Sequence, residues 1–465
     1  MKTLNIIEGY NNFHFIGIGG INMSGLAEIL HNDGCTITGS DRNDSDIIAA
    51  LRKRGISVKI GHDAQNISID AQIIIYNAAV PDDNPEILEA KTRGLRLMDR
   101  AELLGRLMQN YGTAICVAGT HGKTTTTSML AEIFMAADKD PTVMNGGVLP
   151  SMGGALRIGS RDFIIVEACE YNDSFLKFHP NIGIILNLEM DHSDYFANIN
   201  ALRASFRGFV QRIPEDGLLV INGGIEDVEQ IHNGLNCNKS FFGINTTHQY
   251  IDNVCFDDFG HGRFDICSDS GKLGEIVLKV PGHHNIQNAL AAIYTALHCG
   301  IDFNTIATAL TGFTGAVRRF QHIGQYNGAN IVDDYAHHPT EVAATIQAAR
   351  NVAHNRLWVV FQPHTRERTA EFLNEFAKEL AHADELVILD IFNPAGREEE
   401  HCKVHATDLA ELAIKENSAN CNYLPSFDIC VDFLKQNIDK GDLVITMGAG
   451  DVHKVAEILV LQYSN

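Results

Sequence analysis

The sequence has no C-x-x-C pair, although its 465 residues include ten cysteines. The cysteines are scattered singly between Cys35 and Cys430, which argues against a zinc site and against a disulfide framework. No uninterrupted apolar stretch reaches the ~20 residues that span a bilayer, and the first residues are too polar for a signal-peptide core. We therefore expect a cytoplasmic protein with reduced thiols and no membrane insertion.

Positive charge is also scarce, since 36 Lys and Arg residues stand against 58 Asp and Glu residues and the formal net charge is −22. Such a surface repels polyanions on average, so binding to nucleic acid or to anionic lipid is disfavoured. A local basic pocket for a small phosphorylated ligand remains compatible with this balance.

The composition, with 45% hydrophobic and 20% charged residues, is that of a globular protein, and 465 residues suffice for about three domains. Apolar strand-like runs alternate with helical patterns, which predicts an α/β fold with mainly parallel sheets. These runs occupy residues 13–18, 35–39, 73–76, 114–118, 163–166, 182–186, 331–333, 357–361, 385–389 and 442–446. We predict domains at 1–107, 108–316 and 317–465: a Rossmann-like sheet, a central sheet of the P-loop ATPase type and a second Rossmann-like sheet. Residues 237–275, rich in Asn, Asp and Gly, predict irregular strands and loops.

The strongest local motif is GTHGKTTT at residues 119–126, between an apolar strand and a helix. Glycines let backbone N–H groups approach phosphate, and the helix N-terminus adds partial positive charge. Lys123 can reach the terminal phosphates and the Thr124 hydroxyl can ligate Mg²⁺, which predicts a phosphate loop for ATP. The candidate ATP-binding residues here are Gly119, Thr120, His121, Gly122, Lys123, Thr124 and Thr125.

A second glycine-rich turn joins the first strand to the first helix and has the pattern of a dinucleotide-binding fingerprint. Its candidate residues are Gly17, Gly19, Gly20, Asn22, Met23 and Ser24, with Asp41 ending the next strand. A pyrophosphate on this helix N-terminus would suit NAD, FAD or a nucleotide sugar equally. A purely structural tight turn is the alternative.

Acidic and imidazole side chains follow two further apolar strands of the central region. Glu167 and Glu170 come after residues 163–166, and His192 follows the run at 182–186. Ligands bind at the carboxyl edge of an open α/β sheet, so these groups could converge with Thr124 on the metal ions of bound ATP.

These blocks, together with HN at 284–285, Asn288 and DDYAHHP at 333–339, resemble the Mur ligase family in this order over nearly the whole chain. The resemblance implies an ATP- and Mg²⁺-dependent ligase that joins L-alanine to UDP-N-acetylmuramate during peptidoglycan precursor synthesis. It implies a first domain for the UDP-sugar, a central ATPase domain and a third domain that receives the amino acid.

The resemblance also assigns expected roles to residues. Lys123 binds ATP phosphates, Thr124, Glu167 and His192 hold magnesium, and Glu170 joins the first-turn residues at the UDP-sugar. The adenine and nucleotide side is assigned to His284, Asn285, Asn288, Arg319 and Asp334, and the amino-acid side to Tyr335, His337, His364 and Arg368. Lys123, Glu167, His192 and His337 are the expected catalytic residues. His337 or a neighbouring imidazole would take the proton of the incoming amine.

Three other functions are considered at this stage. A non-catalytic nucleotide-binding regulator should lack Glu167 or His192, and both are present. A related recycling ligase that attaches a preformed tripeptide to the same UDP-sugar would share both nucleotide sites. An NAD-dependent dehydrogenase would use the first glycine-rich turn, but it would leave Lys123 and Thr124 without a role.

Overall fold

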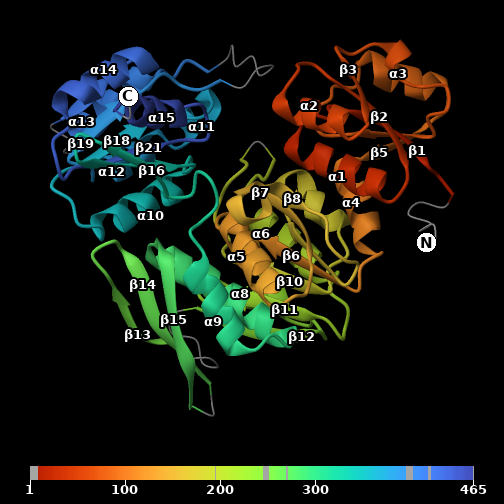
Figure 1. Ribbon diagram of the computed structural model, residues 1–465, viewed down its shortest axis with the longest axis horizontal. Coiled ribbons are helices and arrows are strands. Elements are labelled where there is room, and N and C mark those ends of the chain that lie inside the picture. The colour runs from red at the N-terminus through yellow and green to blue at the C-terminus, as the bar shows by residue number, and fades with distance from the viewer. Residues whose placement is uncertain are drawn as a thin grey trace. The chain divides into compact units, whose positions relative to one another are not determined.

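The computed structural model of the protein describes residues 9–193, 195–243, 251–268, 271–393, 402–416 and 420–463. Figure 1 labels the helices and strands. The chain forms two compact units. The first contains the described residues of Met1–His248 together with Leu290–Ile306, and the second contains those of Gln249–Ala289 and Ala307–Asn465.

The first sheet of the first unit has five parallel strands in the order β3-β2-β1-β4-β5. The strands are β1 (Asn12–Ile16), β2 (Thr36–Asp41), β3 (Ser57–Ile60), β4 (Ile73–Tyr76) and β5 (Arg96–Asp99). The helices are α1 (Ile21–Asn32), α2 (Asp46–Lys53), α3 (Pro85–Thr92) and α4 (Arg100–Met108). Strand order reverses between β1 and β4, as in Rossmann-like sheets, so the prediction for this region is confirmed.

The central sheet has seven strands in the order β12-β11-β10-β6-β9-β7-β8, and β8 alone is antiparallel to its neighbour. The strands are β6 (Thr113–Ala118), β7 (Thr142–Leu149), β8 (Gly154–Arg157), β9 (Phe163–Glu167), β10 (Ile182–Ile185), β11 (Leu218–Asn222) and β12 (Asn238–Phe242). The helices are α5 (Lys123–Ala136), α6 (Ile199–Val210) and α7 (Glu229–His232), with 3₁₀ segments η2 (Pro150–Met152) and η3 (Tyr171–Lys177). The four strands β6, β9, β10 and β11 are mostly apolar and buried, as expected where helices cover both faces of a parallel sheet.

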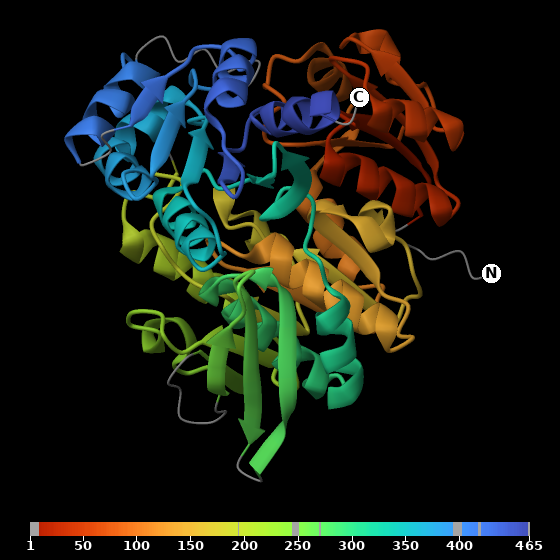
Figure 2. The ribbon, with the colours of Figure 1, turned by 60° about the vertical axis from the view of Figure 1, so that its left-hand side comes forward.

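Three strands of the second unit form an antiparallel sheet, β13 (Ile251–Phe256), β14 (His261–Ser268) and β15 (Gly271–Pro281). Figure 2 shows them as a long green ribbon. The prediction of irregular strands agrees with the described residues, because both strand pairs contain register shifts. The sheet nevertheless has a buried side, where Phe264, Ile266, Ile276 and Leu278 are fully buried.

Helices α8 (His283–His298) and α9 (Phe303–Gly312) follow this sheet, and the division between the two units runs through both. The last sheet has the order β16-β17-β21-β18-β19-β20, with β16 antiparallel to β17 and the remainder parallel. Its strands are β16 (Gln321–Tyr326), β17 (Ala329–Asp334), β18 (Leu357–Phe361), β19 (Glu385–Ile388), β20 (Cys421–Tyr423) and β21 (Leu443–Met447). Its helices are α10 (Pro339–Arg350), α11 (Arg366–Glu371), α12 (Leu373–Leu380), α13 (Ala406–Lys415), α14 (Phe427–Asn437) and α15 (His453–Tyr463). The predicted α/β class is confirmed.

All ten cysteines are free thiols. Among the helices of the described ranges, none combines the length and the apolar character needed to cross a bilayer.

Candidate functional site

The carboxyl ends of three central strands lie at one edge of their sheet. Strand β6 stands between β9 and β10, and the register places Val117 beside Glu167 and Ala118 beside Ile185. The GTHGKTTT loop, the Glu167–Glu170 segment and the segment that leads to His192 all begin at this edge. The sequence prediction that these three segments share a sheet edge is therefore met by the topology.

The loop after β6 has the backbone geometry of a phosphate loop. Gly119 and Gly122 have φ values of 141° and 82°, which side-chain-bearing residues rarely adopt. A Cβ atom on Gly119 would lie 3.2 Å from the backbone nitrogen of Asn187, so the chain passes too closely for a larger residue. Gly122 is the N-cap of α5 and supplies no side chain, which leaves the first N–H groups of the helix for an anion.

Lys123, the first residue of α5, lies in the loop that it is expected to serve. Its ammonium group donates to the carbonyl oxygens of Gly119 and Thr120 and forms a 3.0 Å ion pair with Oε2 of Glu170. Burial is the largest single effect and opposes the charge on Lys123, but the combined effect of the Glu170 carboxylate, Cys169 and Glu167 exceeds it and raises the pKa of Lys123 above its ordinary value. The lysine is therefore a fixed cation at neutral pH. Glu170, expected at the UDP-sugar, lies against the phosphate-loop lysine.

Two residues after β10 hold the phosphate loop in place, and sequence analysis did not single them out. The side-chain amide of Asn187 accepts from the backbone nitrogen of His121 (2.8 Å) and donates to its carbonyl oxygen (3.1 Å). The Thr120 hydroxyl donates to the carbonyl oxygen of Glu189 and accepts from its N–H group, at 3.1 and 3.0 Å. His121 and Thr120 are thus hydrogen-bonded to the loop that follows β10. The asparagine just after that strand was the one sequence feature that could have indicated these contacts.

The expected metal ligands Glu167 and Thr124 approach the same pair of glycines in β7. Glu167 accepts a hydrogen bond from the Gly146 nitrogen, and a Cβ atom on Gly147 would lie 3.0 Å from Cγ2 of Thr124. A carboxylate and a hydroxyl beside a phosphate loop fit Mg²⁺, which takes few protein oxygens and completes its shell with phosphates and water.

His192 sits in the loop after β10 with a positive φ of 55°. Its ring packs on Tyr171 of η3 with centroids 4.6 Å apart, and its backbone N–H donates to its neighbour Asp191. The ring is held by an aromatic contact that sequence spacing does not indicate.

The first glycine-rich turn is closed by the end of β2. The Gly19 nitrogen donates to Oδ2 of Asp41 at 2.8 Å, and the Gly17 nitrogen donates to the carbonyl oxygen of Ser40 at 2.8 Å. Helix α1 begins after Gly20 without a side-chain cap, and Met23 and Ser24 are buried in its first turns.

A small cavity of about 60 Å³ inside the first unit is lined both by the element that follows this turn and by the segment that carries Glu167. Asn22 and Arg100 line it from the first sheet's elements, and Gly146, Glu167 and Cys169 line it from the central sheet's elements. Burial lowers the pKa of Arg100, the first residue of α4. Sequence analysis missed Arg100, because an arginine at a helix start carries no motif.

Residues expected near the nucleotide from the third region lie in the second unit. Asp334 is 8% exposed and accepts from the backbone nitrogens of Phe320 and Ala336, both at 2.7 Å. Burial raises the pKa of Asp334 to about 6, although the charge of Arg319 acts against this. The neighbouring Arg318 is structural, since it forms an ion pair with Asp333 at 2.9 Å.

Three of the residues expected on the amino-acid side form a cluster of rings in the same unit. Tyr335 and His337 have centroids 5.3 Å apart, and those of His337 and His364 are 5.9 Å apart. His364 stacks on Phe392 at 5.6 Å. Arg368 lies in α11, where its backbone nitrogen donates to the Thr365 hydroxyl.

The adenine-side candidates occupy the first turns of α8. Asn285 donates to the carbonyl oxygen of Pro281 at 2.7 Å, and Asn288 donates to Oδ1 of Asn285 at 3.1 Å. His284 precedes them and lies beside Gly282. All three belong to the second unit, whereas the phosphate loop belongs to the first.

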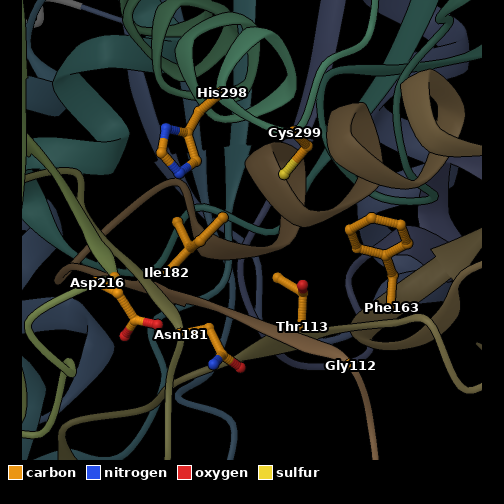
Figure 3. A pocket seen from close by; sticks show the side chains of 9 residues that line it. Gly112, Thr113, Phe163, Asn181, Ile182, Asp216, His298 and Cys299 are labelled. Carbon is orange, nitrogen blue, oxygen red and sulfur yellow. The ribbon is translucent and has the colours of Figure 1, made fainter.

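A larger cavity of about 380 Å³ lies at the opposite edge of the central sheet, where β6, β9 and β10 begin (Figure 3). Thr113, Asn181, Asp216, His298 and Cys299 supply its polar lining. None of the predicted site residues lines this cavity. The larger of the two cavities therefore does not coincide with the candidate site.

Models of three Mur ligase domains match successive parts of the chain. The Mur ligase catalytic domain matches residues 12–112, the Mur ligase middle domain residues 117–296, and the Mur ligase glutamate ligase domain residues 318–450.

Curated relatives match over nearly their full length. The UDP-N-acetylmuramate--L-alanine ligase of Agathobacter rectalis is 46% identical and covers 97% of both chains. That of Acetivibrio thermocellus is 44% identical, over 99% of this chain and 98% of its own.

Two solved structures are similar throughout. The UDP-N-acetylmuramate-alanine ligase of Thermotoga maritima has a TM-score of 0.82 and 27% identity, over 97% of this chain and 99% of that one. A murein peptide ligase of Psychrobacter arcticus has a TM-score of 0.71 and 24% identity, over 98% and 99% of the two chains.

Proposed function

Because the chain belongs to the Mur ligase family, we propose that it is an ATP-dependent ligase that joins L-alanine to UDP-N-acetylmuramate in peptidoglycan precursor synthesis. One observation carries the choice of substrates: curated relatives with this name are 43–46% identical over at least 97% of the chain. We also propose a cytoplasmic location, where ATP is available and thiols stay reduced.

In this proposal, ATP binds on the loop from Gly119 to Thr125. The Lys123 ammonium group and the N-terminus of α5 face its phosphates. Thr124, Glu167 and His192 would hold Mg²⁺, which would neutralise charge on the transferred phosphoryl group. The buried pair with Glu170 supports this, since it keeps the Lys123 side chain charged and fixed beside the loop.

Joining a carboxylate to an amine in water is uphill, so the substrate carboxylate is first activated. A carboxylate oxygen of UDP-N-acetylmuramate attacks the γ-phosphorus of ATP, and ADP leaves. The resulting acyl phosphate is then attacked by the amine of L-alanine, and phosphate leaves. Asn285, Asn288, Arg319 and Asp334 serve the nucleotide, and Tyr335, His337, His364 and Arg368 serve the amino acid.

A tripeptide-attaching ligase is the second candidate, since the Psychrobacter arcticus protein is named a murein peptide ligase. At 24% identity that likeness supports the fold alone. A dehydrogenase is disfavoured because the buried Lys123 and the metal-side Glu167 would have no role in it.

The test is phosphate release with ATP, Mg²⁺ and UDP-N-acetylmuramate, given L-alanine, glycine, L-serine or a tripeptide, followed by product mass. We expect release that requires both UDP-N-acetylmuramate and L-alanine. One methyl group in a pocket is worth about 1–3 kcal/mol, so glycine should react slowly rather than not at all. Equal turnover with the tripeptide would overturn the choice of L-alanine.

A further inference from the structure

His337 has its Nδ1 atom between two oxygen acceptors. Nδ1 lies 3.0 Å from the carbonyl oxygen of Tyr335 and 3.2 Å from Oε2 of Glu341, which lies in the first turn of α10. The same Oε2 accepts the backbone N–H of His337 at 3.1 Å. One carboxylate oxygen therefore holds both the backbone and the ring of His337.

These contacts decide the tautomer of the ring. A carbonyl oxygen can only accept, and so can an ionised carboxylate, so the proton of the neutral imidazole must be on Nδ1. Nε2 then carries the lone pair. The His337 and Glu341 side chains are 23% and 14% exposed, so the ring can still meet a ligand while its partner is largely enclosed.

The two neighbouring imidazoles are engaged differently. His338 is the N-cap of α10, where its Nδ1 accepts from the Thr340 nitrogen at 3.4 Å, and its side chain packs on Phe372. The His364 ring stacks on Phe392. His337 has a carboxylate behind one ring nitrogen and a basic lone pair on the other.

We propose that Glu341 is a positioning residue that holds His337 so that Nε2 accepts the proton of the incoming amine. This rests on the proposed function, because the amine is that of the amino-acid substrate. The protonated imidazole formed in the step is then paired with the Glu341 carboxylate, in the manner of other carboxylate–histidine pairs.

The step balances as follows. Nε2 takes one proton from the ammonium group of L-alanine, which frees the nitrogen lone pair. The nitrogen attacks the acyl carbon, the C–N bond forms, and the C–O bond to phosphate breaks. The second proton leaves the nitrogen with the departing phosphate as HPO₄²⁻, and the imidazolium returns its proton to water.

The test compares Glu341→Gln, Glu341→Ala and His337→Ala with the matched control Glu375→Gln, an exposed carboxylate in the first turn of α12. Gln keeps an oxygen for both N–H groups but removes the charge. In a serine protease, neutralising the orienting carboxylate costs about 10⁴-fold in kcat. We expect Glu341→Gln to lower kcat by about 10-fold to 100-fold. The loss is smaller than in the protease because the Tyr335 carbonyl oxygen still keeps the proton on Nδ1. His337→Ala should lose about 10²–10⁴-fold.

A second nucleophile separates positioning from folding. Hydroxylamine is largely unprotonated at neutral pH, so it attacks an acyl phosphate without a base and gives a hydroxamate. On the same preparations, hydroxamate formation from UDP-N-acetylmuramate and ATP should match the control within about twofold, while the kcat for L-alanine falls and its KM changes little.

Two results would overturn the positioning role: wild-type kcat with L-alanine in Glu341→Gln, or a parallel loss of both reactions in that variant. Wild-type protein that forms hydroxamate but no alanyl product would instead overturn the proposed function, and the positioning role with it.

Discussion

Lys123 and Glu170 show how much of this site depends on single buried charges. The Glu170 side chain is 1% exposed and that of Lys123 is 15% exposed. If one of the two charges is removed, bulk water therefore cannot solvate the other in its place. Removing one member of such a pair leaves an uncompensated charge, which costs more than the pair itself contributes.

We therefore expect Glu170→Gln to destabilise the protein by about 3 kcal/mol, the lower end of the range for a broken buried pair. The double variant Lys123→Met/Glu170→Gln should recover most of this loss, because no buried charge is then left alone. Urea unfolding of both variants measures the effect. Additive losses in the double variant would show that the pair is not energetically coupled.

Binding and chemistry should separate at the ATP site. Lys123→Ala and Glu167→Gln should each lower turnover by about 10²–10³-fold or more, since they remove a charge or a metal ligand that meets the transferred phosphoryl group. His192→Ala should be milder if water can replace the imidazole. Affinity for UDP-N-acetylmuramate, measured by isothermal titration, should stay nearly unchanged. Wild-type turnover of Glu167→Gln at limiting Mg²⁺ would refute the metal assignment.

Asp334 should make the protein less stable as the pH rises through the acidic range. Its pKa is about 6 in the folded protein against an ordinary value of 3.8. Between these values the folded state binds more protons than the unfolded state, so stability falls as pH rises from about 4 to 6. The Asp334→Asn variant has no carboxyl group to titrate, so it does not lose stability in this way. Urea titrations should show its free energy of unfolding rising relative to that of wild type over this pH interval. A difference between the two proteins that does not change with pH would contradict the expectation.

At the scale of elements, the candidate site residues lie at strand ends, and close helix packing sets the position of the segments that carry them. Helix α4 packs against η3, the segment that follows Glu170 and carries the Tyr171 ring against His192. A Cβ atom on Gly105 of α4 would overlap the carbonyl oxygen of Lys177, which ends η3. That backbone contact leaves no room for a methyl group.

Gly105→Ala should therefore destabilise the protein by about 1–3 kcal/mol, the usual cost of overpacking, and displace η3 enough to lower turnover. Gly312→Ala is the matched control, because a Cβ atom on Gly312, which ends α9, would meet no atom within 4 Å. It should be neutral or slightly stabilising. Thermal unfolding and steady-state rates test both variants, and equal behaviour would refute the packing argument.

At the scale of the whole molecule, the hydrophobic cores divide between the two compact units. The cluster that includes Phe15, Phe175 and Phe206 belongs to the first unit, and that around Phe361 and Phe376 belongs to the second. Each unit thus buries apolar surface of its own, the main source of folding free energy.

We expect calorimetry to resolve two unfolding transitions. UDP-N-acetylmuramate should raise the temperature of one of them, that of the unit with the first glycine-rich turn. A ligand at 100 times its dissociation constant adds about 2.7 kcal/mol to the part that binds it. Lys123→Ala should keep this shift, since the first glycine-rich turn is unchanged. A single transition would show that the units unfold together, and an equal shift of two transitions would show that the ligand stabilises both units.

The amino-acid sequence by itself predicted the fold class, the two glycine-rich turns and the common sheet edge beside which Lys123, Thr124 and Glu167 lie. These follow from strand–turn–helix signals within a few residues. It did not indicate β13–β15 as regular strands, because register shifts interrupt their alternation.

Only the tertiary structure decided which groups act on one another. Lys123 meets Glu170, 47 residues away, and His121 meets Asn187, 66 residues away, because parallel strands bring their carboxyl ends to one edge. The contacts of His337 are different, because both acceptors near its Nδ1 atom, the Tyr335 carbonyl oxygen and the Glu341 carboxylate, lie within four residues of it along the chain. The sequence places these groups together, and the structure adds which ring nitrogen they face.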